Sequence, residues 1–197
     1  MELMDRSKYL IEDHISELER KKEELSQLIT YAGNAIVETL LQDGRVFTCA
    51  NGVAASISKI LTLSLSDQFE RERPGLPAIS LDSDNGFISE MARENRLNEC
   101  FAKPIRTLAT EKDVLVVLSL DGNCQNIFQA IQAAHDKDMK VIAITGTESN
   151  NMTSIMLAED CFLPLHCEHK GEFLQTSTLV ITTLLDLIDC TLFGFPH

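Results

Sequence analysis

Tryptophan is absent from this 197-residue sequence, proline and glycine are sparse, and charged residues interrupt every long apolar stretch. With five prolines, nine glycines and 44% hydrophobic residues, the composition is that of a globular protein and excludes collagen-like and low-complexity classes. No charge-free run approaches the roughly 18 residues that a membrane-spanning helix needs. The first residues also lack the basic and apolar regions of a secretory signal. We therefore predict a cytoplasmic protein that makes no membrane contact.

Basic residues are also in short supply. The chain has 17 Lys and Arg against 30 Asp and Glu, a formal net charge of −13 at pH 7. Such a surface repels the phosphate backbone of a nucleic acid unless a local basic patch intervenes. The one dense basic cluster, Arg20–Lys22, is followed at once by Glu23 and Glu24. Direct nucleic-acid binding is therefore disfavoured.

The six cysteines form no CxxC pair, so neither a disulfide framework nor a zinc ribbon is indicated. We interpret them as small buried apolar residues. The segment His166–His169 contains residue types that bind metals, but neighbours in one loop rarely converge on one ion, and no second ligand pair has zinc-site spacing. The residues themselves therefore predict no metal.

Hydrophobic periodicity predicts helices at both ends of the chain. Residues 5–26 and 29–43 carry apolar side chains at helical spacing. Residues 171–193 do so with wider apolar coverage, and Gly194 and then Pro196 end the helix. We expect an N-terminal helical arm over residues 1–44 and a buried C-terminal helix.

Short apolar runs with helix-like segments between them fill the centre of the chain. Runs that are apolar on both faces and alternate with helices are typical of a parallel sheet covered on both sides. The predicted fold class is α/β, a doubly wound, flavodoxin-like sheet of five parallel strands in a single domain over residues 1–197, with its core at 45–170 and its last helix at 171–193. The predicted strands are Val46–Ala50, Ala78–Leu81, Val114–Leu118, Val141–Thr145 and Cys161–Leu165.

Two loops that follow predicted strands carry the functional signal. Asn51 and Gly52 lead from the first strand into a helix, and Ser119, Gly122 and Asn123 do so after the third. Helix N-termini expose unpaired N–H groups, so both loops are candidates for holding an anion. Spacing alone does not separate this hypothesis from two ordinary capped helix starts.

The sequence resembles the SIS (sugar isomerase) domain family, in its phosphoheptose isomerase branch. The resemblance covers nearly the whole chain and rests on four segments, of which the Arg-x-Arg-Pro-x-x-Pro-Ala stretch is quite specific. It implies a homotetramer of five-stranded α/β subunits with sites at the subunit interfaces. The four segments are Cys49–Gly52, Arg71–Ile79, Ser119–Asn123 and Val141–Gly146.

The phosphate loops depart from the pattern of the isomerases, where hydroxyls and amides hold the substrate phosphate. Three or four of the hydroxyls are replaced, and Asp121 adds a carboxylate where a dianion would sit. Hydrogen bonds to a charged group contribute about 1.5–3 kcal/mol each, and like charges repel. Both changes oppose phosphate binding. The replacing residues are Val53, Ala54, Leu120, Asp121 and Cys124.

The catalytic positions depart further. The resemblance places the isomerase's zinc ligands and base at Ile60, Ser64, Gln175 and Thr183, of which only Gln175 retains the family's residue type. Isomerisation needs a base to move a proton between adjacent carbons. We therefore expect no bound cofactor and no isomerase mechanism. One alternative is that His166 or His169 substitutes.

The C-terminal segment resembles the branch of the family that associates with the DnaA replication initiator. In that branch a Leu-Phe pair near the C-terminus contacts the initiator, and this pair maps to Leu192 and Phe193. Three hypotheses stay open: a tetrameric scaffold for a DnaA-type initiator, a sedoheptulose 7-phosphate isomerase, and a silent sugar-phosphate-binding module. In the second and third, the ligand-binding residues are Asn51, Gly52, Ser119, Gly122, Asn123 and Gln175.

Overall fold

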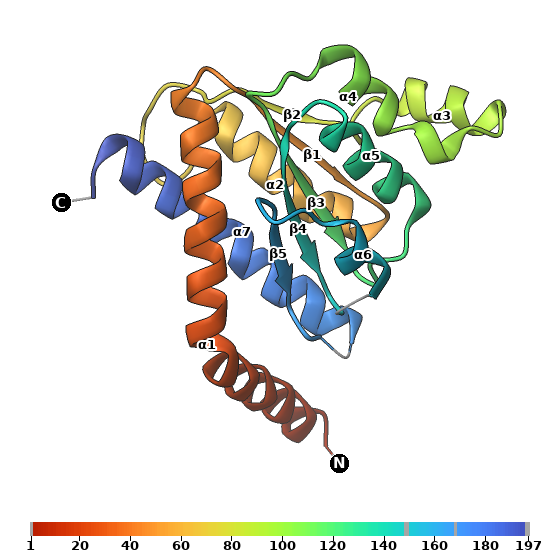
Figure 1. Cartoon of the computed structure of the whole chain (residues 1–197). Helices are drawn as coiled ribbons and strands as arrows, with labels where there is room; N and C mark the ends of the chain where they lie inside the picture. The colour runs from red at the N-terminus through yellow and green to blue at the C-terminus, as the bar shows by residue number, and fades with distance from the viewer. Residues whose placement is uncertain (1, 148–149, 168, 196–197) are drawn as a thin grey trace.

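A five-stranded parallel sheet lies between two layers of helices in the computed structural model, which describes residues 2–147, 150–167 and 169–195 (Figure 1). The strand order is β2-β1-β3-β4-β5, and every neighbouring pair is parallel. The predicted fold class is therefore confirmed, and each predicted strand lies within one residue of an observed one. The strands are β1 (Val46–Ala50), β2 (Ala78–Ser80), β3 (Val114–Ser119), β4 (Lys140–Thr145) and β5 (Cys161–Pro164).

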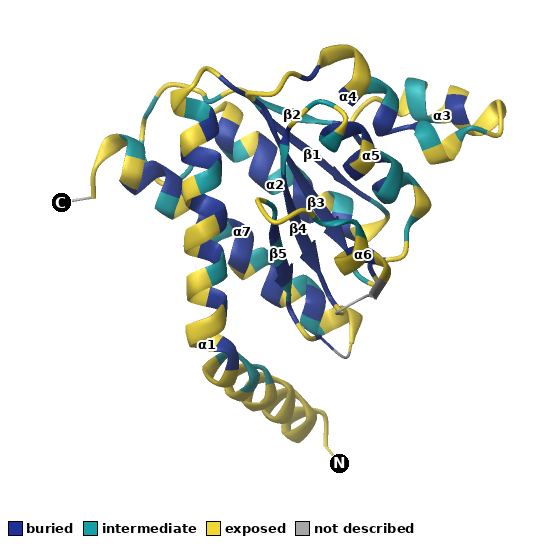
Figure 2. Ribbon diagram, in the orientation of Figure 1, coloured by how far each residue is buried: buried dark blue, intermediate teal, exposed yellow. Residues whose placement is uncertain are grey.

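The central strands form because they are apolar on both faces. Successive side chains of a strand point to opposite sides of the sheet, so alternate residues enter different cores. In β3, Val114, Val116 and Leu118 belong to one hydrophobic cluster, whereas Leu115 and Val117 belong to the other. All of β3 is buried, as the dark strands of Figure 2 show. Helices on both faces account for this double burial.

The helices divide between the two faces. The first cluster packs residues of α1, α2 and α7 against the sheet, and the second packs residues of α3, α4 and α5 against the opposite face. The helices are α1 (Leu3–Leu41), α2 (Val53–Ser66), α3 (Asn85–Arg93), α4 (Ala102–Leu108), α5 (Gln125–His135), α6 (Asn150–Ile155) and α7 (Lys170–Phe193), with a 3-10 turn, η1 (Leu97–Glu99).

The N-terminal arm differs from the prediction. We expected two helices, over residues 5–26 and 29–43, but α1 is one continuous helix of 39 residues. No proline or glycine interrupts the chain near Gln27 and Leu28, so nothing ends the first helix there. The N-terminal half of α1 extends beyond the body of the protein and is largely exposed (Figures 1 and 2).

Helix α7 is long and apolar enough to cross a membrane by length and composition alone. In this structure, however, α7 packs against α1 and α2 and supplies Val180, Ile181, Leu184 and Ile188 to the first core cluster. A core helix of a soluble protein passes the same test, and the packing of α7 is of that kind.

Candidate functional site

The two candidate loops meet at the point where the strand order of the parallel sheet reverses. Strands β1 and β3 are neighbours, with Ala50 opposite Leu118 at their carboxyl ends, and the chain moves outward from them in opposite directions to β2 and β4. Ligands of open α/β sheets bind in the crevice at such a switch point. Asn51 directly follows the last residue of β1 and Ser119 is the last residue of β3, so both lie at this point.

Side-chain hydrogen bonds connect the first loop to helix α5. The Asn51 side chain donates to Asn126 Oδ1 at 2.9 Å and accepts from Asn126 Nδ2 at 2.8 Å. Asn126 also lies 3.6 Å from the Cys100 Sγ. Gly52 adopts φ 57°, a left-handed conformation that suits glycine, and precedes the first residue of α2. The Asn51 amide is thus engaged by protein partners.

In the second loop, the Asp121 carboxylate contacts hydrogen-bond donors of the loop itself. The Asp121 Oδ1 atom accepts a hydrogen bond from the Asn123 backbone N–H at 3.1 Å and lies 3.5 Å from the Ser119 hydroxyl. The buried Ser119 hydroxyl in turn accepts from the Gly122 N–H at 3.1 Å. Asp121 therefore places a negative charge at the start of α5, which is where an incoming phosphate would need these donors.

The remaining predicted ligand residues point elsewhere. The Asn123 side chain accepts from the Asn151 side chain at 3.0 Å, so it faces α6. Gln175 is exposed in the second turn of a different element, α7. The structure therefore joins Ser119, Gly122 and Asn123 in one loop, and sets Gln175 on another layer.

The side chains at the isomerase metal positions do not fit zinc. Zinc sites in proteins use Cys, His, Asp or Glu, whereas these four positions hold an isoleucine, a serine, a glutamine and a threonine. Ile60 packs against the first core cluster, and Thr183 lines an apolar groove between α1 and α7. Throughout the residues that the structure describes, no group of three or more His, Cys, Asp or Glu side chains is placed to hold a metal ion.

The groove beside Thr183, here called the α1–α7 groove, has a volume of about 510 Å³. It lies between residues 15–30 of α1 and the middle of α7, two helices that are far apart in sequence and cover the same face of the sheet. Its apolar lining residues are Ile15, Leu18, Leu25, Ile29, Leu179 and Leu187.

The two histidines line a different hollow. His166 and His169 face a polar cavity of about 210 Å³ together with side chains of α1, including Arg20 and Glu17. Nearby, the buried Lys21 ammonium contacts Glu172 at 3.0 Å, Glu17 at 3.2 Å and the His166 carbonyl. Burial alone would lower the pKa of Lys21, but the two carboxylates outweigh it and raise the pKa. Glu168, part of the same motif, lies outside the described residues.

The cysteines behave as the sequence predicted. All six are free, and five are buried. Burial raises the pKa of Cys161 to about 12 and that of Cys167 to about 11, so both remain uncharged thiols at neutral pH.

Sequence reasoning missed a buried acid beside the first loop. Asp82 follows β2, accepts a short hydrogen bond from the Ser80 hydroxyl, and lies 3.7 Å from the Lys59 ammonium of α2. Burial raises the pKa of Asp82, and Ser80 and Lys59 only partly oppose this effect. An isolated Asp in a strand-end loop gives no signal of burial in the sequence.

The predicted partner-binding pair lies at the opposite end of α7, about 27 Å from Gln175 at 1.5 Å per residue. Leu192 is half-buried against the first core cluster, whereas Phe193 is 41% exposed. Phe195, which sequence reasoning missed, is 80% exposed just beyond the helix. An aromatic residue directly after Gly194 was the available signal.

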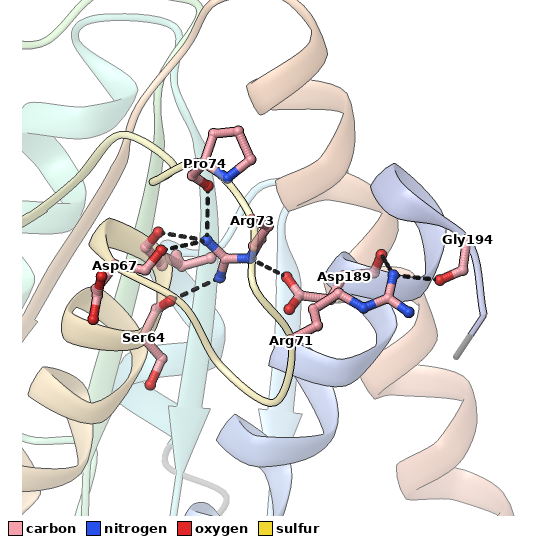
Figure 3. Close-up of polar contacts among 8 residues, drawn as sticks. Ser64, Asp67, Arg71, Arg73, Pro74, Asp189 and Gly194 are labelled. Carbon is pink, nitrogen blue, oxygen red and sulfur yellow. Dashed lines mark hydrogen bonds and ion pairs between the residues drawn. The ribbon is translucent and has the colours of Figure 1, made fainter. Parts of the chain in front are cut away.

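The segment with the Arg-x-Arg motif anchors this end of α7 (Figure 3). Arg73 donates to Asp189 Oδ1 at 2.7 Å and to the Ser64, Leu65 and Asp67 carbonyls at the end of α2. Arg71 donates to the Gly194 carbonyl at 2.6 Å. The motif therefore joins α2 to α7, a role that the sequence did not predict.

Comparisons with known proteins agree with this architecture. The SIS domain family matches residues 11–146. The phosphoheptose isomerase of Chromohalobacter salexigens is 38% identical over 172 residues, which are 87% of each chain. The DnaA initiator-associating protein DiaA of Citrobacter koseri is 32% identical over 195 residues, covering 99% of this chain and 98% of that one.

Solved structures give the same result. The phosphoheptose isomerase of Francisella tularensis superposes with a TM-score of 0.90 at 31% identity, covering 96% of this chain and 99% of its own. That of Neisseria gonorrhoeae superposes with a TM-score of 0.87 at 25% identity, covering 95% and 99%. With its parallel sheet, its strand-end loops and these full-length matches, this chain belongs to the SIS domain family, among the phosphoheptose isomerases and DiaA proteins.

Proposed function

We propose that this protein is a non-catalytic, oligomeric scaffold that binds a DnaA-type replication initiator through the C-terminal end of α7. The observation that carries the proposal is the exposed Phe193 at the end of α7, in a chain that is 32% identical to a DiaA protein over 195 residues. Aromatic side chains of this kind are frequent anchors of protein interfaces.

The strand-end loops support a role without catalysis. A phosphate would have to compete with the Asp121 carboxylate for the Ser119 hydroxyl and the Asn123 N–H. The positions of the isomerase base and metal ligands hold Ile60, Ser64 and Thr183, none of which can abstract a proton from carbon at neutral pH. A scaffold needs neither function.

The exposed apolar surface supports oligomer formation. The α1–α7 groove and the N-terminal half of α1 carry exposed apolar side chains, and contiguous exposed apolar patches mark interaction surfaces. We propose that further copies of the chain cover this surface in a homotetramer. The acidic net charge fits a cytoplasmic protein that touches the initiator and not the DNA.

A second candidate is a sugar-phosphate protein of the same family, either an isomerase or a silent binding module. Its support is the 38% identity to a phosphoheptose isomerase and the retained Asn51, Gly52, Ser119 and Gly122. Conversion of sedoheptulose 7-phosphate would establish the isomerase. A rise in Tm with sugar phosphates in the absence of turnover would establish the binding module.

The deciding experiment is surface plasmon resonance on immobilised initiator from the same organism, with wild-type protein and Phe193→Ala. We expect concentration-dependent binding by the wild type and a loss of at least about tenfold in affinity for the variant. Leu97→Ala is the matched control, because Leu97 is 45% exposed at a distant 3-10 turn. Absence of wild-type binding would overturn the scaffold proposal, and equal losses in both variants would overturn the role of Phe193.

A further inference from the structure

The chain turns sharply where α7 ends. Helix α7 runs to Phe193, and Gly194 then takes φ 83°, a conformation that favours glycine because a Cβ would be strained there. The Gly194 N–H bonds back to the Cys190 carbonyl at 3.0 Å. Phe195 consequently leaves the helix axis. We call residues 192–195 the C-terminal tip.

The side chain of Arg71, which lies outside α7, bonds to the backbone of the C-terminal tip. Arg71 Nη1 donates to the Gly194 carbonyl at 2.6 Å and lies 3.5 Å from the Asp189 carbonyl (Figure 3). A hydrogen bond from a charged donor is stronger than one between neutral groups. Chain ends are poorly ordered unless another element holds them, and here Arg71 supplies that hold.

The backbone segment that carries Arg71 is itself held in place by Arg73. Two residues further on, the Arg73 side chain is 1% exposed and bonds Asp189, whose side chain is 6% exposed. Arg73 also donates to the Leu65, Asp67 and Pro74 carbonyls. The loop that carries Arg71 is thus fastened to both α2 and α7, and Arg71 reaches the tip from a rigid position.

We propose that Arg71 is a positioning residue that fixes the C-terminal tip, so that Phe193 and Phe195 form one pre-organised apolar surface for the initiator. The proposal rests on the proposed function and deepens it, adding Phe195 to the contact surface. A surface that is already ordered loses less conformational entropy on binding. Without Arg71, the same side chains remain present but the backbone at Gly194 is free to sample other directions.

The absence of tryptophan permits a direct test of tip order. In full-length protein, Phe195→Trp places a single indole at the tip, and its fluorescence anisotropy reports local motion without any partner. We expect Arg71→Ala to lower this anisotropy and to weaken binding to immobilised initiator about tenfold. Arg71→Lys, which retains a charged donor for the Gly194 carbonyl, should restore most of both.

Arg93→Ala is the matched control, because Arg93 is an exposed arginine of α3 that pairs with Glu90 and Glu94. It should change neither readout, and Tm should stay constant in both alanine variants. Unchanged anisotropy in Arg71→Ala would overturn the positioning role, as would unchanged affinity while the wild type binds. If the wild type fails to bind initiator, the proposed function and the partner surface fall together, whereas the anisotropy still decides whether Arg71 orders the tip.

Discussion

Asp113 shows how one buried carboxylate organises a turn. It lies immediately before β3 and accepts from the Arg45 N–H at 2.7 Å, from Arg45 Nη2 at 2.9 Å and from the Thr110 N–H at 2.8 Å. Burial alone would raise the pKa of Asp113, but these hydrogen bonds outweigh it and lower the pKa. The ionised form is therefore the one that the fold stabilises.

Asp113→Asn should lower the free energy of unfolding at pH 7 by about 1–3 kcal/mol, because an amide NH₂ would face the donors of Arg45 and Thr110. A carboxyl group with a depressed folded-state pKa contributes stability above its unfolded pKa of about 3.9 and loses it as pH falls through the folded value. Urea titrations between pH 7 and 3 should therefore show the difference between wild type and variant shrinking below about pH 4. A difference that stays constant down to pH 3 would contradict this account.

At the residue scale, the sequence predicted which loops follow the strands but not the contacts that the side chains of these loops make. Ser119, Gly122 and Asn123 fall in one loop because the carboxyl ends of parallel strands carry the loops of an α/β sheet. The sequence also indicated that Asp121 opposes phosphate. It did not indicate that Asn51 pairs with Asn126, because that contact joins residues 75 positions apart.

At the scale of elements, buried strands were predictable and helix continuity was not. The β3 and β4 segments are apolar on both faces, a pattern typical of strands in a parallel sheet that is covered on both sides. Their bounds were predicted within one residue. The boundary that we predicted inside α1 was wrong, because no residue there ends a helix. In the fold, Leu25 and Ile29 lie on either side of this boundary and belong to the same core cluster, so the helix and its buried face continue across it.

The Arg73–Asp189 pair illustrates what binds the elements together. Arg73 donates to Asp189 and to the carbonyls of Ser64, Leu65 and Asp67, where α2 ends and its last carbonyls lack partners within the helix. One guanidinium thus completes the end of α2 and fastens it to α7. The residues involved are up to 125 positions apart, so no local pattern in the sequence indicates the contact.

Arg73→Ala should lower the free energy of unfolding by about 3–5 kcal/mol, because it leaves Asp189 buried without its charge partner. Arg73→Lys should lose less, since an ammonium retains the charge but cannot match the planar fork of donors. Urea denaturation measures both, with Arg96→Ala as the control, because the Arg96 side chain is 41% exposed; it is expected within about 0.5 kcal/mol of wild type. If Arg73→Ala unfolds with the control, the pair does not hold the two helices together.

At the scale of the whole molecule, the N-terminal half of α1 stands out because it exposes apolar side chains to solvent. It projects from the body of the protein, and its exposed apolar residues have nothing in the same chain to cover them among the parts that the structure describes (Figure 2). A helical segment of this length is marginal in water when it is not packed. The exposed apolar residues include Leu3, Met4, Tyr9, Leu10, Ile11 and Ile15.

The proposed contact with other copies of the chain would cover this half-helix and would stabilise both its helical conformation and its apolar face. Ile15 is half-exposed and lines the α1–α7 groove, so Ile15→Glu should place a charge inside the interface between copies. We expect light scattering after size exclusion to give four times the 22.0 kDa chain mass for wild type and a smaller assembly for the variant. Ser16→Glu makes the same charge at the next position of the helix, which is exposed and does not line the groove, and should leave the mass unchanged. A wild type that elutes as a single chain, or an Ile15→Glu variant that retains the wild-type mass, would contradict this arrangement.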